Sequence, residues 1–207
     1  MRFFFLLIFF IYSYGTWAQN FQVPPIDNFV NDYAHIISDN TEKHLNQTLA
    51  QIKKETAIEY AILTVDSLRG NSIEEASIQV VDSWKLGEKK SDLGILLFIA
   101  FKDRKLRIEV GQGLEGTLTD LKSKRIITNI MTPLLKQNRI DEAVLAGSYE
   151  ILHTAAPGLN LDKYFTSSSL VRPSHNTNQV TLSPLQKTLI RILFILLLLF
   201  LIFTRPG

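Results

Sequence analysis

The chain contains no cysteine, and this absence excludes whole classes of chemistry. Without a thiol there are no disulfides, no cysteine nucleophile and no cysteine-based zinc site. Histidine is scarce, and the four present show no HExxH or other paired ligand spacing; they are His35, His44, His153 and His175. A GxSxG nucleophile elbow is also missing. Cysteine hydrolases, cysteine-based zinc sites and serine hydrolases with a GxSxG elbow are therefore excluded.

A basic excess is also missing from the centre of the chain. The formal net charge is +2, with 22 Lys and Arg against 20 Asp and Glu. Arg2 and five basic residues against one acid beyond position 157 leave 16 basic and 19 acidic residues for 20–156, a net charge of −3. A nucleic-acid-binding domain carries a basic face. We therefore expect no nucleic-acid partner.

Long apolar runs occur only at the two ends. Residues 1–18 combine Arg2, an apolar run over 3–12 and the small residue Ala18 at a cleavage point, which predicts a signal peptide. The alternative is a buried N-terminal helix. Its many bulky Phe residues beside a charged terminus fit a globular core poorly. Whether the segment is cleaved is left open by the sequence.

The C-terminal run over 185–204 predicts a transmembrane helix. About twenty residues at roughly 1.5 Å each span the ~30 Å hydrocarbon layer. Lys187 and Arg191 near one end can extend their charges to the interface. A buried core helix is the alternative. Residues 158–184, rich in Ser, Asn, Thr and Pro, predict a polar linker.

These end segments place the central domain outside the cytoplasm. Counting positive charges alone would put the Lys187 and Arg191 side inside, but an export signal at 1–18 should dominate. We therefore expect a membrane-anchored protein with its domain on the periplasmic or cell-surface side.

The domain, residues 26–157, alternates between strand and helix patterns. Apolar runs predict strands over 58–65, 93–101 and 106–110. Cap residues predict four helices: one started by Ser38, one opened by the Ser72–Glu75 capping box and ended by Gly87, one from about Asp120 to Pro133, and one from near Asp141. Strand–helix–strand predicts a right-handed parallel crossover, and the third strand then returns antiparallel. The expected fold class is α/β, with helices on both faces of a small mixed sheet.

A glycine-rich segment follows the third strand. Gly111–Gly116 matches the GxGxxG dinucleotide pattern literally, but it lacks the βαβ context of that motif. Folding the two strands into a hairpin instead brings Asp92 beside the loop that carries Glu115 and Asp120, and Asp32 is a further candidate from the N-terminal loop. Carboxylate oxygens suit Ca²⁺, or less well Mg²⁺. The sequence thus predicts a metal site at Asp32, Asp92, Glu115 and Asp120.

A plainer interpretation of the same carboxylates stays open. In it the loop is merely solvated, and Asp120 stabilises the start of a helix. Asp103 lies a nine-residue strand away, roughly 30 Å at about 3.3 Å per residue, and cannot share the shell. For Asp103 and Arg104 we expect simple turn chemistry.

Several motifs together resemble the TPM domain family. In order they are Asn31–Ala34 with Ile37–Ser38, Trp84–Gly87, Ser91–Gly94, Asp103–Arg104, Glu109–Gly116 and Pro133. The resemblance covers about residues 27–157. It implies an exported, often membrane-anchored domain folded as a three-layer α/β/α sandwich. Unlike many bacterial members, the chain lacks a long Gly/Ser-rich tail.

The resemblance also carries functional expectations. It implies divalent metal, chiefly calcium, at Asp32, Asp92, Glu115 and Asp120, with Glu109 as a secondary candidate. Two functions follow: a calcium-binding module that acts on or with other envelope proteins, or a metal-dependent acid phosphatase that hydrolyses phosphomonoesters. The absence of a catalytic triad and of an Arg beside the acidic loop favours binding.

Overall fold

The computed structural model describes residues 21–87 and 91–165. The predicted signal peptide, the transmembrane segment and most of the polar linker lie outside these residues. Within the described ranges, no helix is both long enough and apolar enough to cross a membrane.

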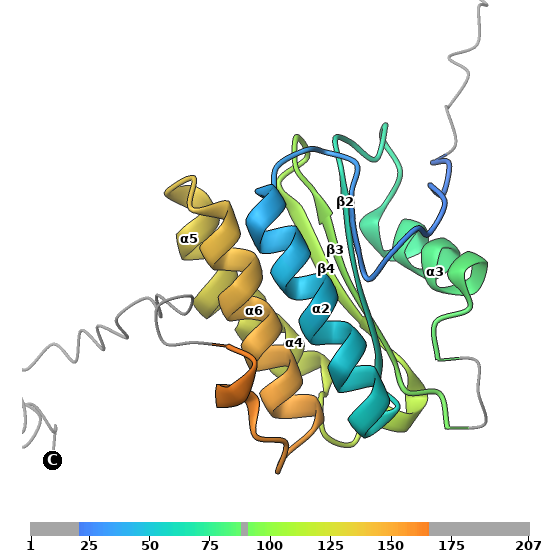
Figure 1. The fold of residues 1–207 in the computed structure, drawn as a ribbon. Helices are drawn as coiled ribbons and strands as arrows, with labels where there is room; N and C mark the ends of the chain where they lie inside the picture. The colour runs from blue at the N-terminus through green and yellow to red at the C-terminus, as the bar shows by residue number, and fades with distance from the viewer. Residues whose placement is uncertain (1–20, 88–90, 166–207) are drawn as a thin grey trace, which may run out of the picture. The chain divides into compact units, whose positions relative to one another are not determined.

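One four-stranded sheet forms the centre of the domain (Figure 1). Its strands lie in chain order: β1 Val30–Asp32, β2 Glu59–Val65, β3 Gly94–Ala100 and β4 Lys105–Val110. The first three are parallel, and β4 returns antiparallel to β3 with Ile95 opposite Val110. The expected α/β class with a mixed sheet is confirmed.

The short strand β1 is absent from the elements predicted by sequence. Its three residues pair in parallel with β2, from Val30 opposite Ile62 to Asp32 opposite Thr64. A run this short shows no alternation that would identify a strand. It matters for function because its pairing with β2 determines at which end of the parallel strands Asp32 lies.

Two helices begin at the predicted caps. Helix α2, Asp39–Thr56, starts where Ser38 accepts the Thr41 N–H, and α3, Ile73–Trp84, starts where Ser72 accepts the Glu75 N–H. The prediction that Gly87 caps α3 is wrong. Lys85 ends the helix in a left-handed conformation with φ 56°, and its N–H donates to the Val81 carbonyl.

The predicted helix from Asp120 does not stop at Pro133. It runs as α4, Asp120–Ile126, then a π-helical segment η2, Ile127–Met131, then α5, Thr132–Lys136. Proline lacks the N–H that an α-helical interior needs. The wider π turn lies directly before Pro133, so the missing donor falls in the first turn of α5 and the chain stays helical.

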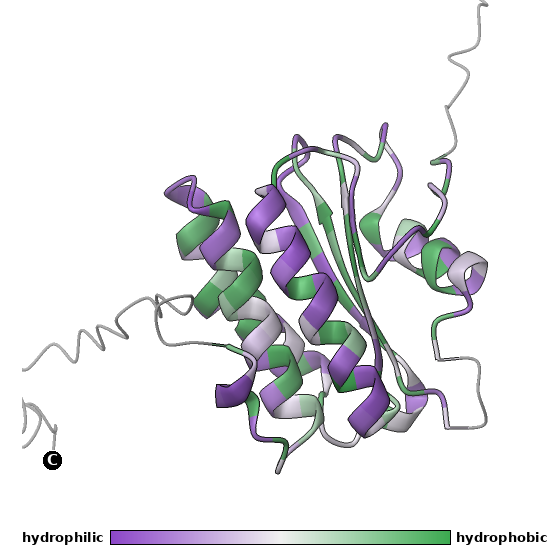
Figure 2. Ribbon diagram, viewed as in Figure 1, coloured by the Kyte–Doolittle hydropathy of each residue, from purple (hydrophilic) through white to green (hydrophobic). Residues whose placement is uncertain are grey.

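Helices cover both faces of the sheet (Figure 1). On one face α2 packs with α6, Ile140–Ala155, over a core that includes Leu45, Leu49, Ile62 and Leu97. On the other face α3 packs over residues such as Ala61 and Phe98. Figure 2 shows the matching pattern, with hydrophilic and hydrophobic residues alternating along α2.

This arrangement departs from the usual handedness of parallel connections. From β1 to β2 and from β2 to β3 the chain steps the same way across the sheet, but it crosses over opposite faces. Geometry then gives the two connections opposite hands, so one is right-handed and the other left-handed. Strands in simple chain order thereby acquire helices on both faces.

A buried polar contact ties the sheet to α6. The Tyr60 hydroxyl on β2 lies 3.0 Å from Ser148 Oγ, and both residues are 1% exposed or less. Burial raises the pKa of Tyr60, so the phenol stays protonated. The pair fixes the start of β2 against the helix above it.

Candidate functional site

Asp92 joins the start of β3 to the glycine-rich loop. Its Oδ2 accepts the Gln112 N–H at 2.8 Å, and its carbonyl oxygen accepts the Gly113 N–H at 3.1 Å. The residue adopts φ 44°, a left-handed conformation that Asp tolerates better than most residues. One carboxylate oxygen is therefore already used to hold the loop.

Close approach of the backbone at Ser91 and Asp92 explains why residues 111 and 113 are glycine. A Cβ on Gly111 would lie 2.4 Å from the Asp92 carbonyl oxygen, and one on Gly113 would lie 1.9 Å from the Ser91 carbonyl oxygen. Only glycine allows the two backbones to approach this closely. The segment forms a short 3₁₀ helix, η1, Gln112–Leu114, between β4 and α4. It is not placed within a βαβ unit, as a dinucleotide loop requires.

Glu115 and Asp120 follow Gln112 and Gly113, the two residues that Asp92 binds, along the same segment. Both are exposed, Glu115 at the end of η1 and Asp120 at the first position of α4 after the cap Thr119. In the part of the chain that the structure describes, no three His, Asp or Glu side chains are grouped so that they could hold a metal ion. The loop supplies oxygen donors of the type calcium prefers, but fewer than its usual six to eight ligands.

Asp32 lies at the carboxyl end of the parallel strands, away from the loop of Asp92. By register it aligns with Thr64 and Ile99, whereas Asp92 precedes β3. Seven residues of extended chain separate these levels, roughly 20 Å at about 3.3 Å per residue. The structure therefore does not bring Asp32 to the loop of Asp92.

At the carboxyl end of β1, Asp32 stabilises the turn that leads into α2. Its Oδ2 accepts the Ile37 N–H at 2.8 Å, and its Oδ1 accepts the hydroxyl of Thr64. Thr64 is fully buried, and its Oγ1 also accepts the Ala34 N–H at 3.1 Å. This contact was missed by sequence reasoning because the pairing of β1 with β2 was missed.

Asp103 serves the neighbouring turn in the same way. Its Oδ2 accepts the Leu68 N–H at 2.6 Å, and its Oδ1 accepts the Ser67 hydroxyl at 3.2 Å. The expected turn role, distant from Asp92, agrees with these contacts. Asp32 and Asp103 thus lie at the carboxyl ends of the parallel strands, and Asp92 lies at their amino ends.

Glu109, the secondary candidate, lies in an ion pair on the face of β4 that packs against α3. Its Oε2 lies 2.5 Å from Arg107 Nε and accepts the hydroxyl of the buried Ser77 at 2.8 Å. The hydrogen bond to Glu109 raises the pKa of Arg107, which therefore stays cationic. Glu109 connects β4 to α3 and does not extend the acidic loop.

Together these contacts define what the carboxylates can do. Each of Asp32, Asp92 and Asp103 accepts a main-chain N–H and so orders a loop. General acid–base chemistry needs a carboxyl group aimed at a substrate position. Here each of the three carboxylates binds a different loop instead.

Comparison with known proteins identifies the fold. A family model described as the TPM domain matches residues 30–154. None of the curated proteins matches the chain.

Three solved structures are similar to the described domain. The N-terminal domain of a protein from P. gingivalis, solved by solution NMR, is 29% identical with a TM-score of 0.56; the match covers 66% of this chain and 83% of that one. The N-terminal domain of the cg2496 protein from Corynebacterium glutamicum is 16% identical, with a TM-score of 0.50 and coverage of 69% and 90%. The BA42 protein from Bizionia argentinensis is 18% identical, with a TM-score of 0.50 and coverage of 62% and 83%.

Proposed function

The chain belongs to the TPM domain family, because the family model matches more than half of it, and on this premise we propose that it is a membrane-tethered, extracytoplasmic binding module. In this proposal the domain acts on or with other envelope proteins and performs no catalysis. A segment resembling a signal peptide at 1–18, a polar linker at 158–184 and an apolar run at 185–204 support the tethered location.

The use of the carboxylates is the observation that carries this proposal. A metal-dependent phosphatase needs carboxylates that hold the cation and leave room for the phosphoryl group. Here the best-placed ones bind main-chain N–H groups instead: Asp32 binds Ile37, Asp92 binds Gln112 and Asp103 binds Leu68. The arrangement supports ordered loops that present a surface, which suits binding.

A divalent cation enters the proposal as a weak ligand of the acidic loop. Glu115 and Asp120 would supply carboxylate oxygens to calcium, and less favourably to magnesium. Water would fill most of the shell, so we propose an affinity of about 10⁻⁴ to 10⁻³ M, as in extracellular calcium modules. The domain is stable without the ion in this proposal.

The catalytic alternative is tested with the full chain in detergent and para-nitrophenyl phosphate. We expect no turnover at acidic or neutral pH with calcium, magnesium or EDTA. The matched variants are Asp32→Asn and Asp92→Asn, which keep an acceptor oxygen for their main-chain partners. Turnover by the wild type that either variant abolishes would overturn the proposal in favour of the phosphatase.

The cation is tested by the melting temperature of the same preparation in about 5 mM calcium and in EDTA. We expect a rise in calcium that Glu115→Gln and Asp120→Asn both remove. The matched control is Glu75→Gln, an exposed carboxylate on α3 outside the loop. An identical melting temperature in calcium and EDTA would contradict the cation site and leave the binding function to stand on its other support.

A further inference from the structure

The helices of the domain differ in net charge. Residues 120–136 form one continuous helical segment of α4, η2 and α5, and it carries a net charge of +3. Its four cations stand against the single acid Asp120; they are Lys122, Lys124, Arg125 and Lys136. By the same count α2 is neutral, whereas α3 and α6 each carry −3 with histidine neutral. Positive charge is therefore concentrated in one helical segment, although residues 20–156 sum to −3.

Within the described residues, none of these four cations forms an ion pair with a carboxylate. The ion pairs between described residues join other side chains: Lys53–Glu59, Lys102–Asp66, Arg107–Glu109, Arg139–Glu142 and Lys163–Glu55. Lys122 Nζ instead donates to the Thr117 carbonyl at 2.7 Å. Cations that no carboxylate neutralises raise the local surface potential. The segment therefore attracts an anionic partner.

The exposed side of this segment forms a stripe. Ile126 is buried in the core, whereas Leu121, Lys124, Arg125 and Thr128 are exposed. Their spacing of three and four residues places these four, which we call the basic stripe, along one side of the helix. Leu121 is 59% exposed, more than any other large apolar side chain in the described ranges. An exposed apolar side chain beside cations is typical of helices that meet membrane headgroups.

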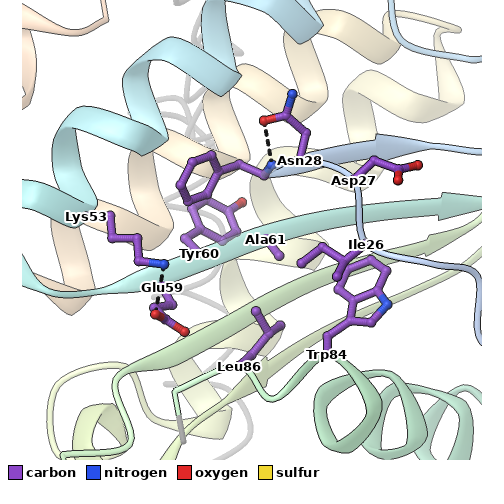
Figure 3. A pocket seen from close by; sticks show the side chains of 10 residues that line it. Ile26, Asp27, Asn28, Lys53, Glu59, Tyr60, Ala61, Trp84 and Leu86 are labelled. Carbon is purple, nitrogen blue, oxygen red and sulfur yellow. Dashed lines mark hydrogen bonds and ion pairs between the residues drawn. The ribbon is translucent and has the colours of Figure 1, made fainter. Parts of the chain in front are cut away.

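The other side of the sheet has the opposite charge. Helix α4 contacts the edge strand β4, whereas a pocket of about 320 Å³ lies at β2, between the segment before β1 and the end of α3 (Figure 3). The charged residues that line this pocket are Asp27, Lys53 and Glu59, which give a net charge of −1. An anionic surface is repelled there and attracted at α4. These charges therefore favour one orientation of the domain in front of such a surface.

The start of α4 lies beside the end of α6. Thr117, just before α4, donates its hydroxyl to the Ala155 carbonyl at 3.2 Å. The last described residue, Phe165, packs edge-on against Tyr149 of α6, with the ring centroids 5.6 Å apart. In the sequence, 19 residues (166–184) then precede the apolar run over 185–204. A flexible linker of this length spans roughly 25 Å, so the proposed tether allows α4 to reach the bilayer.

We propose that the basic stripe, together with Lys122, docks the domain on anionic phospholipid headgroups of the bilayer that anchors the chain. Lys122, Lys124 and Arg125 lie against the lipid phosphates, and Leu121 lies among the headgroups. This inference rests on the membrane tether of the proposed function. It adds the side by which the domain meets the bilayer and the chemistry of the lipid that it contacts.

The absence of cysteine allows a single reporter to be placed on the full chain. Thr128→Cys in the basic stripe and Gln79→Cys on α3, both exposed positions, are labelled with the fluorophore NBD. Each protein is reconstituted into phosphatidylcholine vesicles with or without about 30% phosphatidylglycerol, and a lipid with a spin-labelled headgroup serves as the quencher. We expect quenching at position 128 to be about threefold stronger or more with phosphatidylglycerol, and equal at position 79. Sodium chloride at about 0.5 M should remove the difference, because it screens the charges.

Substitutions in the protein labelled at position 128 locate the contact. Lys124→Gln and Arg125→Gln should each lower the ratio of docked to free domain about fivefold, because a basic residue near an anionic surface contributes about that factor. The matched control is Lys43→Gln, which removes an exposed lysine from α2 and should change nothing. Leu121→Ala should lower the ratio about threefold. Its control is Ile78→Ala on α3, at a position that is 50% exposed. Equal effects of the stripe and control substitutions would overturn this inference.

Flotation of the same vesicles separates the docking from the membrane tether. A protein that floats with both lipid mixtures but shows equal quenching at position 128 in both would overturn the docking and keep the tether. The cations would then be left to an acidic protein partner. Flotation and quenching with phosphatidylglycerol alone would support the docking and contradict the tether. A protein that floats with neither mixture would contradict both.

Discussion

Tyr60 and Ser148 contribute the buried hydroxyl pair that joins β2 to α6, with their oxygens 3.0 Å apart. The contact lies within the core between the sheet and the layer of α2 and α6. It therefore joins the sheet to this helix layer through a polar contact as well as through apolar packing.

Removing the partners of this pair should have unequal effects. Ser148→Ala leaves the phenol buried without a partner and should lower the free energy of unfolding by about 1–3 kcal/mol. Tyr60→Phe should cost less, about 0.5–1.5 kcal/mol, since the serine hydroxyl can bond within its own helix. Urea unfolding of both variants and of the double variant measures the coupling. Strict additivity of the two changes would contradict the contact.

Asp92 should tolerate amide substitution far better than truncation. Asp92→Asn keeps an oxygen for the Gln112 N–H and a residue suited to φ 44°, so its stability should stay near that of the wild type. Asp92→Ala loses the bond and keeps the strained backbone, at a cost of about 1–3 kcal/mol. Asp92→Gly should fall between them, because it relieves the backbone only. A destabilised Asn variant would point to a need for the negative charge, as a bound cation would impose.

Two glycines of the same loop should respond in opposite directions. Gly113→Ala places a methyl group 1.9 Å from the Ser91 carbonyl oxygen, so the variant should lose about 2 kcal/mol or more or fail to fold. Gly116→Ala meets no atom within 4 Å and should gain about 0.4–1 kcal/mol. Thermal melts of both variants provide the comparison. Similar losses at both positions would show that the loop is not packed against Ser91 as described.

Acid should weaken the attachment of the domain's C-terminal turn. The hydrogen bond from Lys163, and next that from Tyr164, lowers the pKa of Glu55 below its ordinary value of 4.5. A depressed carboxyl pKa contributes stability above the unfolded value, and this contribution is lost as the pH falls through the folded pKa. The melting temperature of the wild type should therefore fall more steeply below about pH 4.5 than that of Glu55→Gln. Parallel curves for the two proteins would contradict this role of Glu55.

The sequence predicts the individual elements of this fold well because their signals are local. Ser38 and Ser72 start their helices, and the apolar run before Asp66 forms β2. The prediction that a helix stops at Pro133 is wrong because a π turn before it places the missing N–H in the first turn of α5. No simple sequence pattern identifies such a turn.

The candidate site is predicted only in part because it depends on strand pairing. The hairpin of β3 and β4 follows from adjacent segments, so the contact of Asp92 with the loop at Gln112 was expected. The place of Asp32 depends instead on the parallel pairing of a three-residue strand with a distant one. Such pairing is a tertiary effect that periodicity in the sequence does not record.

The ion pair on β4 affects whether copies of the domain associate through the edges of their sheets. An edge strand has main-chain groups without a partner strand, so another chain can pair with it. Charged side chains on the edge strand hinder this pairing. On one face β4 carries Lys105, Arg107 and Glu109, and the last two are paired to each other. We expect these charges to make this edge of the sheet resist edge-to-edge pairing between copies of the domain.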